Sequence, residues 1–367
     1  MTAMPQSSHP PLRLAITAQA LTHGGGAERY LRDVVSGLHA AGVRPSVLAR
    51  KIDPELPQAA MADGVRIDTR GVPRLWRSAV FDWKVGRWLR RNPTDCVFAV
   101  NHSVHADVAI CGGTHPGFLQ AMGRRAGPAD HRQIALERRT YARARRIVAH
   151  SELMKDELQR FHDVAADRID VLYPPVDADR FRPLTDASRR SVRKRLGLPP
   201  DRVVFLLVST GHTRKGFDEL EALFATTDLP ITLAVAGRPL PRPARNVVEL
   251  GYRQDVETVF AAADYTVVAS RYEPFGLVGV ESVLCGTPVV IADTVGSAEV
   301  IGDSAKVAYS RSDPQGLSTA LAQACSRAQA QEHRIADPAA ALRYDPAVRV
   351  HVDRLLALFR SSARADA

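Results

Sequence analysis

The sequence predicts an α/β protein made of two doubly wound, Rossmann-like domains that face each other across a cleft. The chain has 367 residues, which is enough for two ordinary domains. Short apolar runs alternate with amphipathic stretches, as in parallel sheets covered by helices. This alternation occurs twice, before and after a segment rich in Pro, Asp and Arg at 174–183. Ligands of such sheets bind at the carboxyl edges of the strands, so a cleft between two such edges is the expected site.

The first domain, expected over residues 1–174, begins with an apolar strand at 12–21. An amphipathic helix follows at 27–42 and ends at Gly42, because glycine adopts the left-handed conformation that closes many helices. Further apolar runs predict the other strands of this domain, at 44–50, 65–69, 95–101, 105–113 and 145–151.

The second domain, expected over residues 184–345, repeats the pattern after the linker. A last amphipathic helix is expected within 346–367, and it either packs back on the first domain or closes the second. The strands of the second domain are predicted at 202–210, 231–237, 246–251, 265–270 and 288–294.

The composition, 45% hydrophobic and 24% charged, is that of a soluble globular protein. No apolar run approaches the roughly 20 residues that a membrane span needs, and the first residues lack the layout of a secretion signal. The four cysteines are scattered, mostly within apolar stretches, so we expect them to be reduced and buried. A cytoplasmic location follows as an expectation.

A run of three glycines, residues 24–26, directly follows the first predicted strand and precedes the helix at 27–42. Glycines let the backbone approach a ligand closely, and a helix directs its free N–H groups toward its amino end. The spacing is not that of a dinucleotide fingerprint, and no suitable acidic residue ends the next strand. A plain turn would not need three glycines, so Gly25 and Gly26 are predicted to contact a ligand.

The second domain begins in the same way, with a strand, a flexible turn and a helix. Arg214 and Lys215 stand in that turn, at an edge that suits a nucleotide. Arginine offers paired hydrogen bonds and lysine a point charge, so the two together can neutralise a diphosphate. A solvated basic turn is the alternative, and the position of the pair at this edge favours the ligand role.

Two carboxylates, Glu273 and Glu281, flank a Gly-rich helix start in the stretch 271–290. A carboxylate does not bind phosphate, but it can accept two hydrogen bonds from a vicinal diol, as in ribose recognition. We therefore expect Glu281 to bind ribose hydroxyls and Glu273 to bind hydroxyls of an attached sugar. The backbone N–H groups around Phe275, Gly276 and Leu277 then remain for the diphosphate. Two unrelated surface glutamates are the alternative that spacing alone leaves open.

At these residues the chain resembles a known family. "EPFGLVGVE" is similar to the Glu-x7-Glu motif of retaining glycosyltransferases of family 4, which have the GT-B fold of two Rossmann-like domains. "GGGAERYL" resembles the amino-terminal glycine loop of that family, and "VLYPPVDADRF" and "TRKGFDEL" resemble its linker and its basic segment. "CGGTHPGFLQ" and "ALERRTYARARRIVAHS" resemble lipopolysaccharide-core glucosyltransferases in particular.

The resemblance implies transfer of a hexose from a nucleotide diphosphate sugar, UDP-glucose first, with retention at the anomeric carbon. Arg214 and Lys215 would stabilise the leaving diphosphate, so no metal and no further cofactor is expected. His115 would bind the donor sugar and orient it, instead of serving as a plain turn histidine. The acceptor implied is a bacterial surface glycolipid such as lipopolysaccharide core.

The first half of the chain carries almost all of the net charge of +9, with 25 Lys and Arg against 17 Asp and Glu up to residue 172. All three tryptophans, Trp76, Trp83 and Trp88, fall within the basic segment 74–91. A basic helix bearing aromatic residues is typical of a membrane-surface element, so we expect peripheral association with the inner face of the cytoplasmic membrane. The alternative for each tryptophan is a place in the core.

The sequence leaves other functions open. A family member with a soluble acceptor is the nearest alternative, and a non-catalytic nucleotide-sugar binder is another. A nucleic-acid-binding protein is not favoured, because no basic recognition helix or aromatic RNA-binding strand appears and the second half is nearly neutral.

Overall fold

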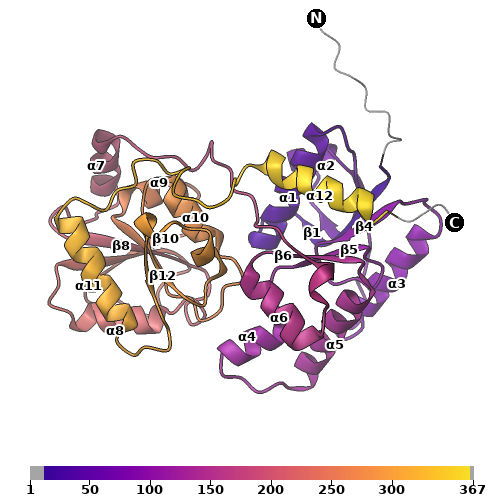
Figure 1. The fold of residues 1–367 in the computed structure, drawn as a ribbon, viewed down its shortest axis with the longest axis horizontal. Coiled ribbons are helices and arrows are strands. Elements are labelled where there is room, and N and C mark those ends of the chain that lie inside the picture. The colour runs from indigo at the N-terminus through magenta and orange to yellow at the C-terminus, as the bar shows by residue number, and fades with distance from the viewer. Residues whose placement is uncertain (1–11, 364–367) are drawn as a thin grey trace, which may run out of the picture.

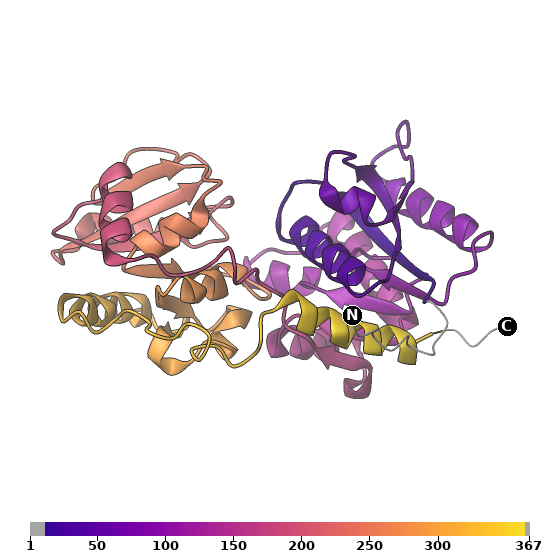
Figure 2. The same cartoon turned by 90° about the horizontal axis from the view of Figure 1, so that it is seen from above.

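Two α/β units lie beside one another, each built on one parallel sheet (Figures 1 and 2). The computed structural model describes residues 12–363 of the chain. Strands of the first unit fall between residues 14 and 171, and those of the second between 203 and 309. Within both units the order of strands reverses partway across the sheet, so the prediction of two doubly wound domains is confirmed.

The sheet of the first unit has seven parallel strands in the order β3-β2-β1-β4-β5-β6-β7. Its switch point lies between β1 and β4, where parallel sheets leave a crevice for a ligand. The strands are β1 (Leu14–Leu21), β2 (Ser46–Ile52), β3 (Asp63–Arg66), β4 (Cys96–Ala99), β5 (Val108–Cys111), β6 (Arg146–Ala149) and β7 (Ile169–Val171).

Several helices of the first unit bury an apolar face in its core. In α1, for example, Leu31, Val34 and Leu38 recur at helical spacing and are fully buried. The helices are α1 (Gly26–Ala40), α2 (Pro57–Ala60), α3 (Arg77–Leu89), α4 (His115–Ala121), α5 (Pro128–Arg143), α6 (Glu152–His162) and the 3₁₀ turn η1 (Ala166–Arg168).

The sheet of the second unit has six parallel strands in the order β10-β9-β8-β11-β12-β13. They are β8 (Val203–Ser209), β9 (Ile231–Gly237), β10 (Val247–Gly251), β11 (Tyr265–Val268), β12 (Val289–Ala292) and β13 (Lys306–Tyr309). The accompanying helices are α7 (Asp186–Arg195), α8 (Phe217–Thr226), α9 (Val256–Ala262), α10 (Leu277–Leu284) and α11 (Gly316–Gln329), with 3₁₀ turns η2 (Gly296–Glu299) and η3 (Asp303–Ala305).

The last helix, α12 (Val348–Ser361), crosses back from the second unit and lies along α1 of the first (Figure 1, yellow). Val352, Leu355 and Phe359 enter the core of the first unit. Gly37 of α1 makes this close packing possible, since a Cβ there would stand 2.6 Å from the Val352 side chain. The two units are therefore joined by two chain crossings, at 172–185 and before α12.

Two edge strands, β7 and β13, have no counterpart among the predicted strands. β7 has three residues and β13 has four, and both carry charged or polar positions, so neither forms an apolar run. The strand predicted at 65–69 is found slightly earlier, at Asp63–Arg66, because its backbone pairs with β2 from residue 46 onward. Edge strands pair on one side only, and their sequences are correspondingly less apolar.

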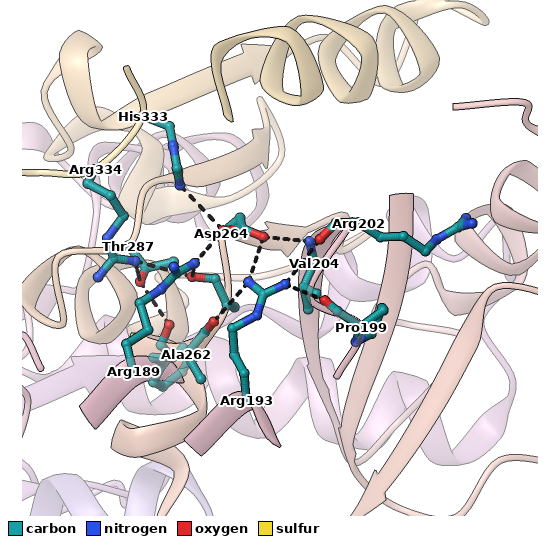
Figure 3. Close-up of polar contacts among 12 residues, drawn as sticks. Arg189, Arg193, Pro199, Arg202, Val204, Ala262, Asp264, Thr287, His333 and Arg334 are labelled. Carbon is teal, nitrogen blue, oxygen red and sulfur yellow. Dashed lines mark hydrogen bonds and ion pairs between the residues drawn. The ribbon is translucent and has the colours of Figure 1, made fainter. Parts of the chain in front are cut away.

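A buried ion cluster around Asp264 ties helix α7 to the two central strands of the second sheet, β8 and β11 (Figure 3). Arg189 and Arg193 extend from α7 to the Asp264 carboxylate, the Arg193 contact measuring 2.9 Å. The same carboxylate accepts the N–H of Val204 in β8 at 2.7 Å. Burial alone would raise the pKa of Asp264, but the contact with His333 and the charges of Arg193 and Arg189 lower it. Asp264 thus fixes α7 and β8 relative to the start of β11.

Candidate active site

A cavity of about 670 Å³ lies between the two units, at the carboxyl edges of both sheets. Loops from both units line it, as the doubly wound topology requires. Apart from His115, the residues predicted to bind the donor are all among the lining residues, namely Gly25, Gly26, Arg214, Lys215, Glu273, Phe275, Gly276, Leu277 and Glu281. The structure therefore brings three separate segments of the sequence into one site.

Two helices begin at this cavity and direct free N–H groups into it. Helix α1 starts at Gly26, and its N-cap Gly25 has no side chain that could satisfy those groups. Helix α10 starts at Leu277 after Gly276, whose φ of 87° is in the left-handed region. A Cβ at Gly276 would stand 2.9 Å from the Glu273 side chain, so glycine is needed there. Both helix starts suit an anionic ligand.

Glu273 lies against both cations of the basic segment. Its carboxylate accepts hydrogen bonds from Arg214 at 2.8 Å, Lys215 at 2.5 Å and the Ser270 hydroxyl at 3.1 Å. Burial alone would raise the pKa of Glu273, but the charges of Lys215 and Arg214 lower it below its usual value. Glu273 is therefore ionised at neutral pH, and its carboxylate contacts both the Arg214 guanidinium and the Lys215 ammonium group.

Glu281 forms an ion pair across the cleft with Arg29 of α1, which is also cavity-lining. The guanidinium of Arg29 lies over the Phe181 ring, with Cζ 5.3 Å from the ring centroid. Sequence reasoning did not identify Arg29, although it stands in the glycine-loop stretch. The pair joins residues 252 positions apart, so no local pattern could indicate it.

Both neighbours of Glu273 are bonded to the first unit. The Tyr272 hydroxyl lies 2.8 Å from the Thr114 N–H and 2.8 Å from a Glu157 oxygen. On the other side, the Ser151 hydroxyl donates to the Pro274 carbonyl at 2.6 Å. The position of Glu273 therefore depends on how the two units meet.

His115 is not among the residues that line the cavity. It is the first residue of α4, and its Nε2 lies 2.7 Å from Asp130 at the start of α5. The nearby Gly112 and Gly113 do line the cavity, so the predicted loop reaches the site, whereas the His115 side chain contacts Asp130 instead. The role predicted for His115 in orienting the donor sugar has no support from this geometry.

Two other histidines, His102 and His150, line the cavity and were not identified from the sequence. His150 follows β6, and burial lowers its pKa to about 3, so its ring is neutral at pH 7. His102 follows β4, and burial also lowers its pKa, although nearby Glu137 acts in the opposite direction. The sequence shows only that each histidine is a polar residue after an apolar strand. Many loops have such a residue, so this pattern alone does not identify a site.

Tyr252 and Arg253 complete the far end of the cavity, after β10. Tyr252 is 79% exposed, so its ring offers an open apolar face there. Among residues 12–363, no group of three His, Cys, Asp or Glu side chains is arranged to hold a metal ion.

Solved structures share this architecture. WaaG, whose structure is described as that of a glycosyltransferase involved in lipopolysaccharide biosynthesis, aligns with a TM-score of 0.75 at 20% identity, over 95% of this chain and 98% of its own. HepE of Anabaena in complex with UDP-glucose aligns with a TM-score of 0.72 at 18% identity, over 95% of this chain and 100% of its own. Two doubly wound domains that enclose such a cleft define the GT-B class of glycosyltransferases.

Comparison of sequences identifies the family. Residues 24–180 match Glycosyltransferase Family 4, and residues 188–339 match Glycosyl transferases group 1. A Burkholderia thailandensis protein named "Probable transglycosylase" is 44% identical over 96% of this chain and 98% of its own. D-inositol 3-phosphate glycosyltransferase 1 of Catenulispora acidiphila is 29% identical over 92% of this chain and 91% of its own. The chain belongs to glycosyltransferase family 4, and the predicted resemblance is confirmed.

Proposed function

We propose that this protein is a retaining hexosyltransferase that moves a hexose, glucose from UDP-glucose first, to a glycolipid of the bacterial surface such as lipopolysaccharide core. The observation that carries the proposal is the convergence of Gly25, Arg214, Lys215, Glu273 and Glu281 on one cavity. Phosphate-binding helix starts, two cations and two carboxylates are the groups that a nucleotide diphosphate sugar requires.

In the proposed complex the diphosphate lies between the start of α10 and the Arg214–Lys215 pair. Negative charge grows on the leaving diphosphate as the bond to the anomeric carbon breaks. Fixed cations placed at that charge stabilise the transition state more than the ground state. Glu281 accepts hydrogen bonds from the ribose and Glu273 from the transferred sugar. An oxygen of the leaving phosphate accepts the proton of the attacking hydroxyl, on the same face of the sugar.

A panel of nucleotide sugars, assayed with a bacterial glycolipid extract as the acceptor and in the presence of EDTA, tests this function. We expect one donor to be consumed with release of its nucleoside diphosphate, because the charges that stabilise the leaving group belong to the protein. Proton NMR of the product should show the anomeric configuration of the donor. An enzyme that consumes no donor until magnesium or manganese is added would show that the leaving-group stabiliser is misassigned. Failure with every donor, with and without metal, would contradict the proposed function.

The acceptor is proposed to be a lipid because of the surface around α3. Trp76 and Trp83 are 61% and 58% exposed, whereas Trp88 is partly buried against the core of the first unit. Arg74, Arg87 and Arg90 are exposed in the same segment. Exposed tryptophans beside cations suit an anionic membrane interface. No helix within residues 12–363 is long and apolar enough to cross a bilayer.

Removal of both exposed tryptophans should weaken binding to phosphatidylglycerol-containing vesicles by about tenfold or more, because each inserts a large apolar surface. The variant is Trp76→Ala with Trp83→Ala, and vesicle co-sedimentation measures the change. Tyr252→Ala is the matched control, since Tyr252 is an exposed aromatic residue far from α3. If wild type does not sediment with vesicles, or if the control loses as much binding, the proposal that this surface binds a membrane is wrong. The alternative of a soluble acceptor is then favoured.

A further inference from the structure

A second cavity, of about 250 Å³, opens in the first unit beside the donor cavity. His102 and Val100 line both cavities, so a ligand in one would approach a ligand in the other at this point. The second cavity lies at the carboxyl ends of β1, β2 and β4, and side chains of α3 and α5 close it. Its position is that of a second substrate, next to the donor sugar.

Arg50, at the end of β2, is the charged residue of this cavity. Its guanidinium lies over the buried Phe81 ring, with Cζ 5.2 Å from the ring centroid. The Nε of Arg50 is buried and has no hydrogen-bond partner, and Nη2 has only a 3.5 Å contact to the Ser78 hydroxyl. Within residues 12–363 no carboxylate forms an ion pair with Arg50. Buried donors normally have a partner, so this one points to a ligand.

A second unpaired polar atom and a second cation accompany Arg50. Asn101 Oδ1, which follows β4 and lines the same cavity, is also buried without a partner. Burial lowers the pKa of Arg50, and the charge of nearby Arg77 lowers it further. Arg77 does not line the cavity, but two neighbouring cations that form no ion pair with a carboxylate of residues 12–363 raise the local positive potential and favour an anion at Arg50.

We infer that this cavity binds a phosphate group of the acceptor, through the Arg50 guanidinium, and a neighbouring hydroxyl through the Asn101 side chain. This inference rests on the proposed function and specifies the acceptor as a phosphorylated molecule. Bound in this way, the acceptor presents a hydroxyl at His102, where the two cavities meet. Helix α3, which forms one wall, carries the exposed Trp83 and directly follows the exposed Trp76, so a lipid phosphate could enter from a membrane.

Calorimetry on the full chain, with UDP in excess to occupy the donor site, tests the inference. Glucose 6-phosphate and monomeric dihexanoylphosphatidic acid are the two phosphate probes, and glucose is the neutral reference. At least one phosphate probe should bind, and Arg50→Gln should weaken that binding about tenfold or more, since bonds to charged groups are lost. Arg50→Lys keeps the charge without the Nε–H and should give a smaller loss. The probe that binds identifies a sugar phosphate or a lipid phosphate as the source.

Lys51→Gln is the matched control. Lys51 is the exposed neighbour of Arg50, and its replacement by glutamine removes the same positive charge. An equal loss in Lys51→Gln, or no binding of either phosphate by wild type, would overturn the inference. UDP affinity in the Arg50 variants should be unchanged, because Arg50 does not line the donor cavity. If no nucleoside diphosphate of the donor panel binds but phosphate binding still depends on Arg50, the anion site stands and the proposed transferase function fails.

Discussion

Replacement of Arg214 and Lys215 by alanine together should lower kcat by at least about 10³-fold, because a single lost oxyanion donor already costs 10²–10³. Both cations line the cavity between the two units, Lys215 is buried, and the two share Glu273 as their carboxylate partner. Without them the growing charge of the leaving diphosphate meets only backbone N–H groups and the uncompensated Glu273 carboxylate. Nucleoside diphosphate binding should weaken as well, since both cations contact the ground state. Steady-state rates with the active donor, beside calorimetry with the free nucleotide, measure the two effects.

The control for this variant is Arg238→Ala, which removes an exposed arginine at the same edge of the second sheet. Arg238 does not line the cavity, so its loss should leave the rates nearly unchanged. A second double variant, with glutamine at both 214 and 215, removes the two charges but preserves side-chain bulk around Glu273. Circular dichroism checks that the alanine and the glutamine double variants fold. A folded double variant with activity close to wild type would contradict the role of the cations.

Asp264→Ala should cost about 3–5 kcal/mol of the free energy of unfolding, the loss that follows when one partner of a buried ion pair is removed. Arg193, which is 8% exposed, would be left without its carboxylate, and the Val204 N–H without its acceptor. Urea unfolding measures the loss, and hydrogen exchange in β8 and β11 assigns it to the second unit. The folded pKa of Asp264 is depressed, so its stabilisation is present above the unfolded pKa of about 3.9 and disappears as the pH falls below it.

Asp228→Ala is the matched control, because Asp228 is an exposed aspartate of the same unit. Surface substitutions of this kind change stability by about 0.5 kcal/mol or less. If the two alanine variants unfold at the same urea concentration, the Asp264 cluster does not support the second unit in the way described.

The sequence was sufficient for the architecture and for most of the candidate donor site. Glycine loops and cations that follow apolar strands must meet at the carboxyl edges of parallel sheets, so local patterns place Gly25, Arg214 and Glu273 together. Short edge strands such as β7 and β13 lack an apolar run of their own, and their pairing is visible only in the sheet. Contacts between the two units depend on how the domains meet, which no spacing in the chain encodes.

His115 and Arg29 illustrate this limit from opposite directions. His115 stands in the predicted loop, but its side chain contacts Asp130 at the start of the next helix, α5, and does not line the cavity. Arg29 was passed over in the glycine-loop stretch, although it faces Glu281 across the cleft. Helix position alone does not say which side chains meet a partner from the other domain.

Calorimetric titration with UDP of wild type, Glu281→Gln, Glu273→Gln and Arg29→Gln tests most directly whether the two carboxylates divide the donor between ribose and sugar. Loss of the charge-assisted bonds to ribose, each worth about 1.5–3 kcal/mol, should weaken UDP binding to Glu281→Gln by at least about tenfold. Glu273→Gln frees Arg214 and Lys215 from their carboxylate, so UDP should bind it about as well as wild type while turnover falls. Arg29→Gln tests whether Glu281 acts by binding ribose or only by its ion pair with Arg29. This variant leaves Glu281 in place, so it should keep UDP affinity if Glu281 binds ribose. Equal losses of UDP affinity in the two glutamate variants, or a loss in Arg29→Gln that matches Glu281→Gln, would contradict the proposed division of the donor.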